Sequence, residues 1–431
     1  MIHFDPFEAA HRDDPYPAYA ALRREAPVYE IKDKNAFAVA RYDDVAFILR
    51  HPELFSSNAM QDVLQSGFRT GVSTLGTGLS GEEAKRLAEL VRTLPVNPFE
   101  AMRARSLIAI DPPVHGPMRN VVNRGFTPRR IAELEPRVRA IAREALDAVE
   151  AKGSGELDLI HDYATPLPVR VIAELLGVEP ERADDFKRWS NASVAGSTGS
   201  AAGYTAETLL RSFAELSTYM VSVIEDRRRK PREDLITTLT RAESGETALT
   251  SAEVVMFTLL LLVAGNETTT NLLGNTMLAL LANPDQLALV QREPARIPAL
   301  VEEALRYDGP IQFLARGALE DVELSGVKIP KGSIVLPLNG SANRDEAQFP
   351  NGERFDVTRA PQGHLAFGFG NHFCLGASLA RLEARVALEE LLTRFVRFER
   401  LDDRVEYIDS FLIRGLRHLR LRVGTGTVLS S

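Results

Sequence analysis

The chain of 431 residues is 45% hydrophobic and 26% charged, an ordinary globular composition with enough length for a large core. Its formal net charge of −8 argues against nucleic acid as a general partner. The sequence begins without a basic segment followed by an apolar one, and its longest apolar run, residues 254–265, is too short to span a bilayer. We therefore expect a cytoplasmic protein with no signal peptide and no membrane anchor.

The first predicted elements are a hairpin and a long loop. Residues 28–31 and 37–39 contain β-forming side chains and flank Asp33-Lys34-Asn35, as in a β-hairpin. Residues 56–109 are rich in glycine near their centre, and we expect them to form one long, mobile loop. A second mobile loop is expected at residues 191–203, where Ser, Gly and Ala predominate.

Most of the remaining chain is predicted to be helical. Apolar residues from 131 to 149 recur at helical spacing, and Pro136 within this stretch either kinks the helix or begins a second one. Short strands are expected at 322–324, 327–329 and 334–336. No linker, repeat or low-complexity tract divides the chain. We therefore predict a single domain over residues 1–431 that is mainly α with a small β-rich region.

Cys374 is the only cysteine, so the chain can form neither an internal disulfide nor a cysteine-rich metal site. It lies in Phe367-Gly368-Phe369-Gly370-Asn371-His372-Phe373-Cys374-Leu375-Gly376. A lone cysteine is ordinarily a small core residue, but here Gly370 and Gly376 remove side chains beside the thiol, and Phe367 and Phe373 can shield it. Helical spacing after Cys374 places the thiol just before a helix N-terminus, where backbone N–H groups stabilise a thiolate. An axial cysteine thiolate is one of the ways in which proteins hold haem iron.

A second motif lies in a predicted buried helix. Thr250-Ser251-Ala252-Glu253 is a capping-box pattern that starts this helix, and an apolar run leads to Gly265-Asn266-Glu267-Thr268-Thr269. A carboxylate and two threonines in mid-helix are costly unless they are satisfied or functional. Threonine can bend a helix by bonding back to a carbonyl, and Gly265 leaves a gap in the helix face, so we expect a widened groove here. Taken alone, the pattern fits equally well a buried helix that becomes amphipathic.

These two motifs resemble the cysteine-ligand loop and the Ala-Gly-x-Asp/Glu-Thr oxygen-activation motif of the cytochrome P450 haem-thiolate monooxygenases, specifically the soluble bacterial kind. The resemblance runs nearly end to end and implies the cytochrome P450 fold, with heme b (iron protoporphyrin IX) held by Cys374. It implies that Glu267 and Thr268 manage protons in catalysis; Glu267 stands where many members carry Asp. In the Cys374 loop, Phe367, Gly368 and Gly376 are then expected haem contacts.

Further matches to the family concern the haem propionates, which are anions and need cationic or hydrogen-bonding partners. Asp111-Pro112-Pro113-Val114-His115 and the following Arg119 match a family pattern in which His and Arg meet propionates. Arg316 matches another such contact, and His372 in the Cys374 loop a fourth.

Glu303 and Arg306 can pair across one helix turn. The Glu-x-x-Arg pattern is common by chance and is usually a solvated surface pair. In the family, however, this pair is locked by a second arginine downstream. Arg354 takes that place here, with Arg359 as its rival, and we interpret the triad as structural.

The resemblance predicts an NAD(P)H-dependent monooxygenase that inserts one atom of O2 into an apolar organic substrate by hydroxylation or epoxidation. No P-loop, flavin or Rossmann fingerprint is present, so the electrons must come from a separate ferredoxin and ferredoxin reductase. Arg124, Arg129 and Arg130 form a basic cluster suited to an acidic ferredoxin, and the enzyme itself is expected to be a monomer. The segments that match substrate-contacting parts of the family contain Leu260, Ala264, Ile311, Gln312, Phe313, Phe411, Leu412 and Ile413.

Three other classes remain as alternatives. A haem-binding sensor or electron carrier would not need the pair Glu267-Thr268, and a peroxide-dependent haem oxygenase typically carries Arg-Pro in its place. A hydrolase with a cysteine nucleophile would need a partner histidine, for which His372 is too close in sequence to be persuasive.

Overall fold

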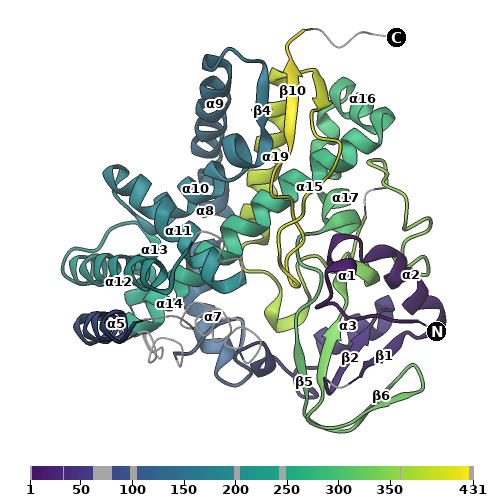
Figure 1. The fold of residues 1–431 in the computed structure, drawn as a ribbon, viewed down its shortest axis with the longest axis horizontal. Coiled ribbons are helices and arrows are strands. Elements are labelled where there is room, and N and C mark those ends of the chain that lie inside the picture. The colour runs from purple at the N-terminus through teal and green to yellow at the C-terminus, as the bar shows by residue number, and fades with distance from the viewer. Residues whose placement is uncertain are drawn as a thin grey trace. The chain divides into compact units, whose positions relative to one another are not determined.

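The structure is a computed structural model that describes residues 2–32, 34–61, 80–97, 104–198, 204–241, 249–359 and 361–426 (Figure 1). Its contacts divide the chain into two compact units. The first unit consists of Met1–Ser56, Ile131–Pro168 and Thr268–Ser431. The second consists of Ser57–Arg130 and Val169–Glu267.

A five-stranded sheet forms one part of the first unit. Its strand order is β1-β2-β8-β5-β3, and all neighbours are antiparallel except β2 and β8. The pairing of Val28 with Val39 confirms the predicted hairpin. Val39, Phe55 and Val335 are fully buried in the core cluster on this sheet. The strands are β1 (Val28–Ile31), β2 (Ala36–Val39), β3 (Phe55–Ser56), β5 (Arg316–Ala318) and β8 (Ile334–Pro337).

Two smaller sheets complete the β structure of the first unit. β6 (Val322–Leu324) and β7 (Val327–Ile329) pair with each other, and β10 (Arg420–Gly424) lies between β4 (Glu156–Asp158) and β9 (Arg397–Arg400). The three strands expected between residues 322 and 336 are therefore confirmed. They were recognisable because β-forming residues, alternating with charged ones in the first two strands, lie close to turn residues such as Gly326 and Gly332.

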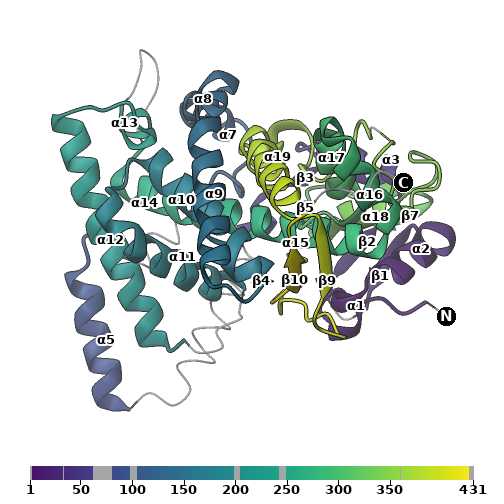
Figure 2. The same ribbon diagram turned by 90° about the horizontal axis from the view of Figure 1, so that it is seen from above.

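The helices of the first unit gather around α15 (Thr268–Ala282), most of whose residues are buried. α9 (Glu135–Ala151) packs beside α19 (Ala377–Arg394), and Arg139 of α9 bonds Glu389 (2.7 Å) and Glu390 (2.8 Å) of α19 (Figure 2). The other helical segments are α1 (Ala9–Asp13), α2 (Tyr16–Glu25), α3 (Tyr42–Arg50), η2 (Leu159–Ala164), α16 (Pro284–Arg292), η5 (Pro294–Arg296), α17 (Ile297–Asp308), α18 (Asn339–Ala342) and η6 (Gly370–His372).

In the first unit, Pro136 does divide the amphipathic stretch predicted at 131–149, because α8 ends at Glu133 and α9 begins at Glu135.

The described residues of the second unit form helices joined by turns and loops, and none of them lies in a strand. The helical segments of the second unit, with two that cross its boundary, are α5 (Gly81–Thr93), α7 (His115–Asn123), η1 (Arg124–Phe126), α8 (Pro128–Glu133), α10 (Pro166–Leu176), η3 (Pro180–Arg182), α11 (Ala183–Thr198), α12 (Ala206–Arg229), α13 (Leu235–Thr240), α14 (Ser251–Leu261) and η4 (Leu262–Glu267).

The predictions of mobile loops at residues 56–109 and 191–203 are both wrong in part. Within 56–109, α5 forms because Ser80 and Glu83 make a capping box: the Glu83 N–H donates to the Ser80 hydroxyl (3.2 Å) and the Ser80 N–H to the Glu83 carboxylate (2.7 Å). Within 191–203, α11 continues to Thr198, and the Ser193 hydroxyl is satisfied inside the helix by the Trp189 carbonyl (2.7 Å). Residues 62–79, 98–103 and 199–203 of these two predictions lie outside the described residues.

One helical stretch is unusually long and apolar. Among the described residues, only Ser251–Ala282 is long and apolar enough to cross a membrane, with a hydropathy of 1.3 in its most apolar window. Buried core helices meet the same criterion, and 44% of that window is buried within the protein.

Candidate active site

The Cys374 loop is a tight turn that ends where α19 begins. The Cys374 N–H donates to the Phe367 carbonyl (2.8 Å), and the Cys374 carbonyl accepts from the Ala377 N–H (3.4 Å). Cys374 therefore does precede a helix N-terminus, as the sequence predicts. The cysteine is only partly buried.

The glycines of this loop have different roles. Gly368 and Gly370 have φ of 69° and 67°, the left-handed region that favours glycine. A Cβ on Gly370 would lie 2.9 Å from the Leu49 carbonyl oxygen, so local backbone packing accounts for this glycine, not the space beside the thiol that we expected. A Cβ on Gly376 would meet no described protein atom within 4 Å. Gly376 therefore borders open space next to Cys374, as a site for a flat group requires.

Two aromatic rings of the loop lie near each other. The rings of Phe367 and Phe373 lie 6.2 Å apart, and the Arg381 guanidinium lies 4.5 Å from the centre of the Phe367 ring. Phe373 is 41% exposed, which is high for so large an apolar side chain. The loop thus presents apolar surface beside the thiol.

The Glu267-Thr268 motif lies where helix geometry changes. α14 leads into η4, a π-helical segment that ends at Glu267, and α15 begins at Thr268. Such π turns interrupt regular helices and are frequent at functional sites. Ala264 is exposed, and Glu267 and Thr268 keep part of their surface accessible.

Gly265 does not leave the open gap that we expected. A Cβ on this residue would lie 2.6 Å from Cδ1 of Ile172 in α10, so Ile172 fills the gap. The π turn is instead anchored by Asn266, whose Nδ2 donates to the Ser190 hydroxyl (3.1 Å). The π turn, and not a missing side chain, widens the helix at this point.

Glu383 is a buried titratable group on α19. The structure buries it to 2% exposure, and its Oε2 accepts a hydrogen bond from the Thr269 hydroxyl (3.2 Å). Among the described residues, its Oε1 has no hydrogen-bonding partner. Burial raises the pKa of Glu383 to about 8, against the opposing effect of the Thr269 hydrogen bond, so the carboxyl is protonated near neutral pH. Its three-residue spacing from Val386 was the available signal that it shares the apolar face.

The four expected propionate partners are distributed over both units. His115 and Arg119 lie on α7 in the second unit; His115 is 3% exposed, and burial, helped by the Arg119 charge, lowers its pKa. Arg316 is buried at the start of β5, where it donates to the Ala315 carbonyl (3.0 Å), and His372 ends η6. Arg316 and His372 belong to the same unit as Cys374.

The Glu303–Arg306 pair is completely buried and is not a surface pair. Arg306 donates through Nε to Glu303 Oε2 and through Nη2 to Glu303 Oε1, both at 2.8 Å. The prediction that Arg354 completes the triad is wrong, because the Arg359 Nε lies 3.3 Å from Glu303 Oε1. Arg354 contributes only its carbonyl, which accepts a hydrogen bond from Arg306 (3.0 Å). The fold of the segment after residue 350 brings the Arg359 side chain, not that of Arg354, to the carboxylate.

The substrate-contact candidates separate by burial. In the first unit, residues 311 and 413 form an isolated β-bridge, and the Gln312 N–H donates to the Leu412 carbonyl (3.2 Å), so these two segments lie side by side. Gln312, Phe313 and Ile413 are nevertheless buried by protein atoms, which argues against direct substrate contact. The candidates that keep accessible surface are Leu260, Ala264, Ile311, Phe411 and Leu412.

Comparison with known proteins identifies the family. The Cytochrome P450 family model matches residues 203–413. Cytochrome P450 107B1 of Saccharopolyspora erythraea is 37% identical over 425 residues, which cover 97% of this chain and 97% of the relative. The chain belongs to the cytochrome P450 family. The 6-deoxyerythronolide B hydroxylase of the same organism is another P450 relative, 38% identical over 415 residues and covering 95% of this chain and 96% of its own.

Solved P450 structures show the same fold. Cytochrome P450 CYP109Q5 from Chondromyces apiculatus aligns with a TM-score of 0.83 and 41% identity, over 99% of this chain and 100% of the other. CYP109E1 from Bacillus megaterium, in complex with testosterone, aligns with a TM-score of 0.79 and 34% identity, over 96% of this chain and 100% of the other. The predicted cytochrome P450 fold is therefore confirmed.

As a P450, the protein is an oxidoreductase of the monooxygenase class that uses haem, O2 and redox partners. The Cys374 loop fits such a cofactor in two respects. It carries a partly accessible thiol at a helix N-terminus, and it leaves space beside Gly376 into which no described protein atom projects. Arg316 and His372 add cationic or hydrogen-bonding groups from the same unit.

Proposed function

We propose that this P450 hydroxylates or epoxidises a medium or large apolar molecule, with Cys374 as the axial ligand of heme b. When bound, haem supplies oxygen activation and insertion. The observation that carries the proposal is the partly buried Cys374 at the N-terminus of α19, together with half-buried Glu267 and Thr268 where a π turn ends.

The remaining haem contacts that we propose serve to place and hold the cofactor. Phe367 would supply apolar contact, while Gly368 and Gly376 would allow close approach of the backbone. His115, Arg119, Arg316 and His372 would hold the propionates by charge and hydrogen bonding. Heme content after purification of His115→Ala and Arg316→Ala measures these roles.

The central experiment is an absorption spectrum of the reduced, haem-loaded protein with carbon monoxide. A thiolate ligand gives a strongly red-shifted Soret band, which Cys374→His should abolish together with monooxygenase activity, because imidazole donates less electron density. Ser378→Ala, an exposed change on the first turn of α19, is the matched control and should leave the band unchanged. A Cys374→His variant with the wild-type spectrum and full activity would overturn the assignment.

Two relatives support the proposed substrate class. The solved CYP109E1 complex contains testosterone, and another relative is a 6-deoxyerythronolide B hydroxylase. We propose a steroid-like, terpenoid, fatty-acid or polyketide substrate in contact with Leu260, Ala264, Ile311, Phe411 and Leu412. Spin-state titrations should respond to such compounds and not to small polar ones. Ala264→Leu should change the ranking of ligands by size, whereas Phe313→Leu, a change at a buried side chain, should lower stability and preserve the ranking.

We further propose a cytoplasmic monomer that receives electrons from an acidic ferredoxin served by a ferredoxin reductase. Arg129 is exposed and Arg124 half-buried, whereas Arg130 also donates to the Arg124 carbonyl (3.4 Å) and the Thr238 hydroxyl (3.3 Å). Opposite charges would steer the encounter, so charge reversal at Arg124 and Arg129 should slow reduction, most strongly at low salt. Reduction rates that respond neither to salt concentration nor to charge reversal at Arg124 and Arg129 would contradict this docking surface.

A further inference from the structure

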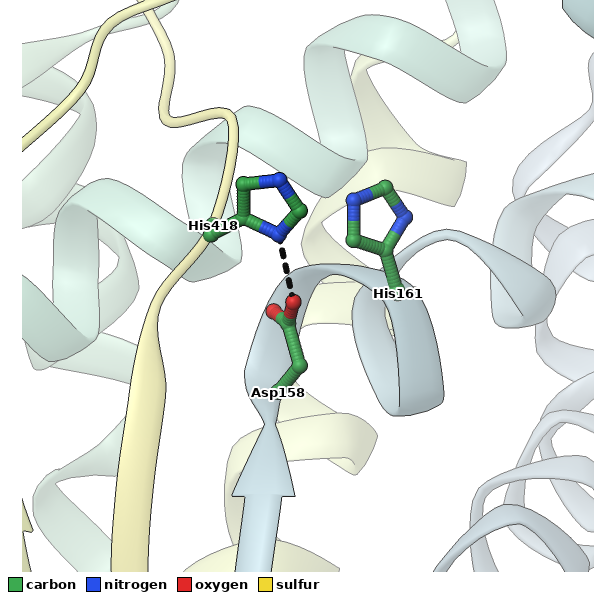
Figure 3. Close-up of side chains that lie close together, drawn as sticks. All are labelled: Asp158, His161 and His418. Atoms are coloured by element: carbon green, nitrogen blue, oxygen red, sulfur yellow. Dashed lines mark hydrogen bonds and ion pairs between the residues drawn. The ribbon is translucent and has the colours of Figure 1, made fainter. Parts of the chain in front are cut away.

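A second cluster of metal-ligating side chains lies outside every segment proposed to bind haem. Asp158 ends β4, His161 lies in η2, and His418 shortly precedes β10, all in the first unit (Figure 3). Each residue offers one ligand atom, and these atoms all lie within 4.8 Å of one another. Asp158 Oδ2 lies 2.7 Å from His418 Nδ1, and His161 turns one ring nitrogen toward His418 (Figure 3).

The backbone holds two of these residues in place. The β4–β10 pair aligns Asp158 with Arg420, and the Leu159 N–H donates to the Leu419 carbonyl (2.9 Å). Asp158 Oδ1 accepts the N–H groups of Ile160 (3.1 Å) and Leu419 (3.3 Å). The carboxylate is thus oriented by its first oxygen, and its second oxygen faces His418. Hydrogen bonds that orient a ligand in this way are a regular feature of metal sites.

We propose that Asp158, His161 and His418 bind one divalent late-transition cation, with Zn²⁺ as the best match. Two imidazoles and a carboxylate suit zinc, and water can complete a tetrahedron on the exposed side. Metal–ligand distances of about 2.0–2.1 Å require ligand atoms about 3.3 Å apart in a tetrahedral site. Both histidines are exposed and all the ligand atoms lie within 4.8 Å of one another, so we expect rotation of the two imidazole side chains to bring them to this spacing.

The surrounding charges leave Asp158 available to a cation. Lys152 pairs with Asp162 (2.6 Å), and Arg420 donates through Nε to Asp402 (2.9 Å).

A metal at this position would link the β4-β10-β9 sheet to the helices that carry the candidate active site. In η2, which carries His161, the Tyr163 hydroxyl donates to the Ala387 carbonyl of α19 (2.7 Å), and the Ala164 carbonyl accepts from Thr270 of α15 (3.2 Å). These are the helices that follow Cys374 and begin at Thr268. Zn²⁺ should therefore raise the thermal unfolding midpoint of the haem-loaded protein, because a ligand that binds only the folded state stabilises it.

The test is zinc titration of the untagged, haem-loaded full chain in competition with a chromophoric zinc indicator. We expect one Zn²⁺ to bind per wild-type chain. The zinc affinity should fall about tenfold or more in His161→Gln and in His418→Gln, since even outer hydrogen-bonding partners of metal ligands contribute about 10–100-fold. His161 is the decisive position, because Asp158 also caps η2 and its replacement can disturb folding.

The matched control is His3→Gln, in another exposed histidine–carboxylate contact, where His3 Nε2 lies 2.9 Å from Glu8 Oε2. Zinc affinity should be unaffected by that change. The proposal is overturned if wild-type protein binds no zinc, if His161→Gln and His418→Gln bind zinc as tightly as wild type, or if His3→Gln weakens binding equally. The carbon monoxide spectrum should be the same with and without zinc, which separates this site from Cys374 and from the proposed monooxygenase function.

Discussion

Replacing Glu383 by Gln should make the protein more stable than wild type in alkaline solution, by a margin that shrinks as the pH falls and vanishes only near pH 4.5. Glu383 is 2% exposed, and its Oε2 accepts from the Thr269 hydroxyl. A glutamine oxygen can accept the same hydrogen bond and cannot ionise. The substitution therefore removes a buried titratable group while it preserves both volume and hydrogen bonding.

The sign and size of this stability difference follow from proton linkage. The carboxyl has an ordinary pKa of 4.5 and a folded-state pKa of about 8, so between these values the folded protein holds a proton that the unfolded chain has lost. Wild-type stability is then highest below pH 4.5 with respect to this group, and it falls as the pH rises toward about 8. At about 1.4 kcal/mol per pH unit, the whole effect is at most about 5 kcal/mol. We expect Glu383→Gln to exceed wild type by about 2–5 kcal/mol near pH 9.

The assay is urea unfolding of the haem-loaded proteins, followed by circular dichroism at about pH 6 and about pH 9. Glu390→Gln, on the same helix, is the matched control. Burial opposes ionisation of Glu390, but hydrogen bonds from Arg143 and Arg139 outweigh it and lower the pKa. Its stabilising effect is present above the ordinary carboxyl pKa, so the control should be less stable than wild type at both pH values. Wild-type and Glu383→Gln stabilities that change in parallel between the two pH values would refute the buried protonated carboxyl.

Three further predictions concern the other buried contacts and the motif. Arg306→Leu should destabilise the protein by about 3–5 kcal/mol in urea unfolding, because it leaves the buried Glu303 carboxylate without its paired charge. The loss of stability should be smaller for Arg359→Ala and smallest for Arg354→Ala, and equal losses for these two would contradict the assignment of Arg359 to the triad. Gly265→Ala should cost about 1–3 kcal/mol, since its Cβ would lie 2.6 Å from Ile172, and Ile172→Val should recover part of the loss if overpacking is the cause. Thr268→Ala should keep the thiolate spectrum but yield less product and more hydrogen peroxide per NAD(P)H, because it removes the hydroxyl that we propose delivers protons, while stability changes by only about 1 kcal/mol; unchanged coupling would make Thr268 a structural residue.

Prediction from the sequence succeeded where the signal is local. The hairpin at Val28–Val39 and the short strands after residue 322 are encoded by period-two patterns and turn residues within a few positions. The position of Cys374 before a helix follows from the apolar spacing that comes after it. The helix α5 was missed although its signal was equally local, because the capping box at Ser80 and Glu83 lies next to a glycine-rich stretch.

The third arginine shows where such prediction stops. Residues 354 and 359 are both arginines, and both follow the helix that carries Glu303 and Arg306, so no local pattern distinguishes them. Only the path of the chain after residue 350 decides that Arg359 reaches Glu303 while Arg354 offers a carbonyl. The burial of Gln312 and Phe313 is likewise set by distant segments that cover them.

The sequence by itself determined the helical class of this P450 and the positions of its Cys374 loop and Glu267-Thr268 motif. Each of these depends on the order of residues within one or two helical turns, where propensity, spacing and glycine placement act directly. Only the tertiary structure decided that Glu383 is a protonated acid, that Ile172 fills the space beside Gly265, and that Asp158, His161 and His418 converge. Burial, steric contact and convergence depend on which distant segments meet, and that is a property of the packed chain.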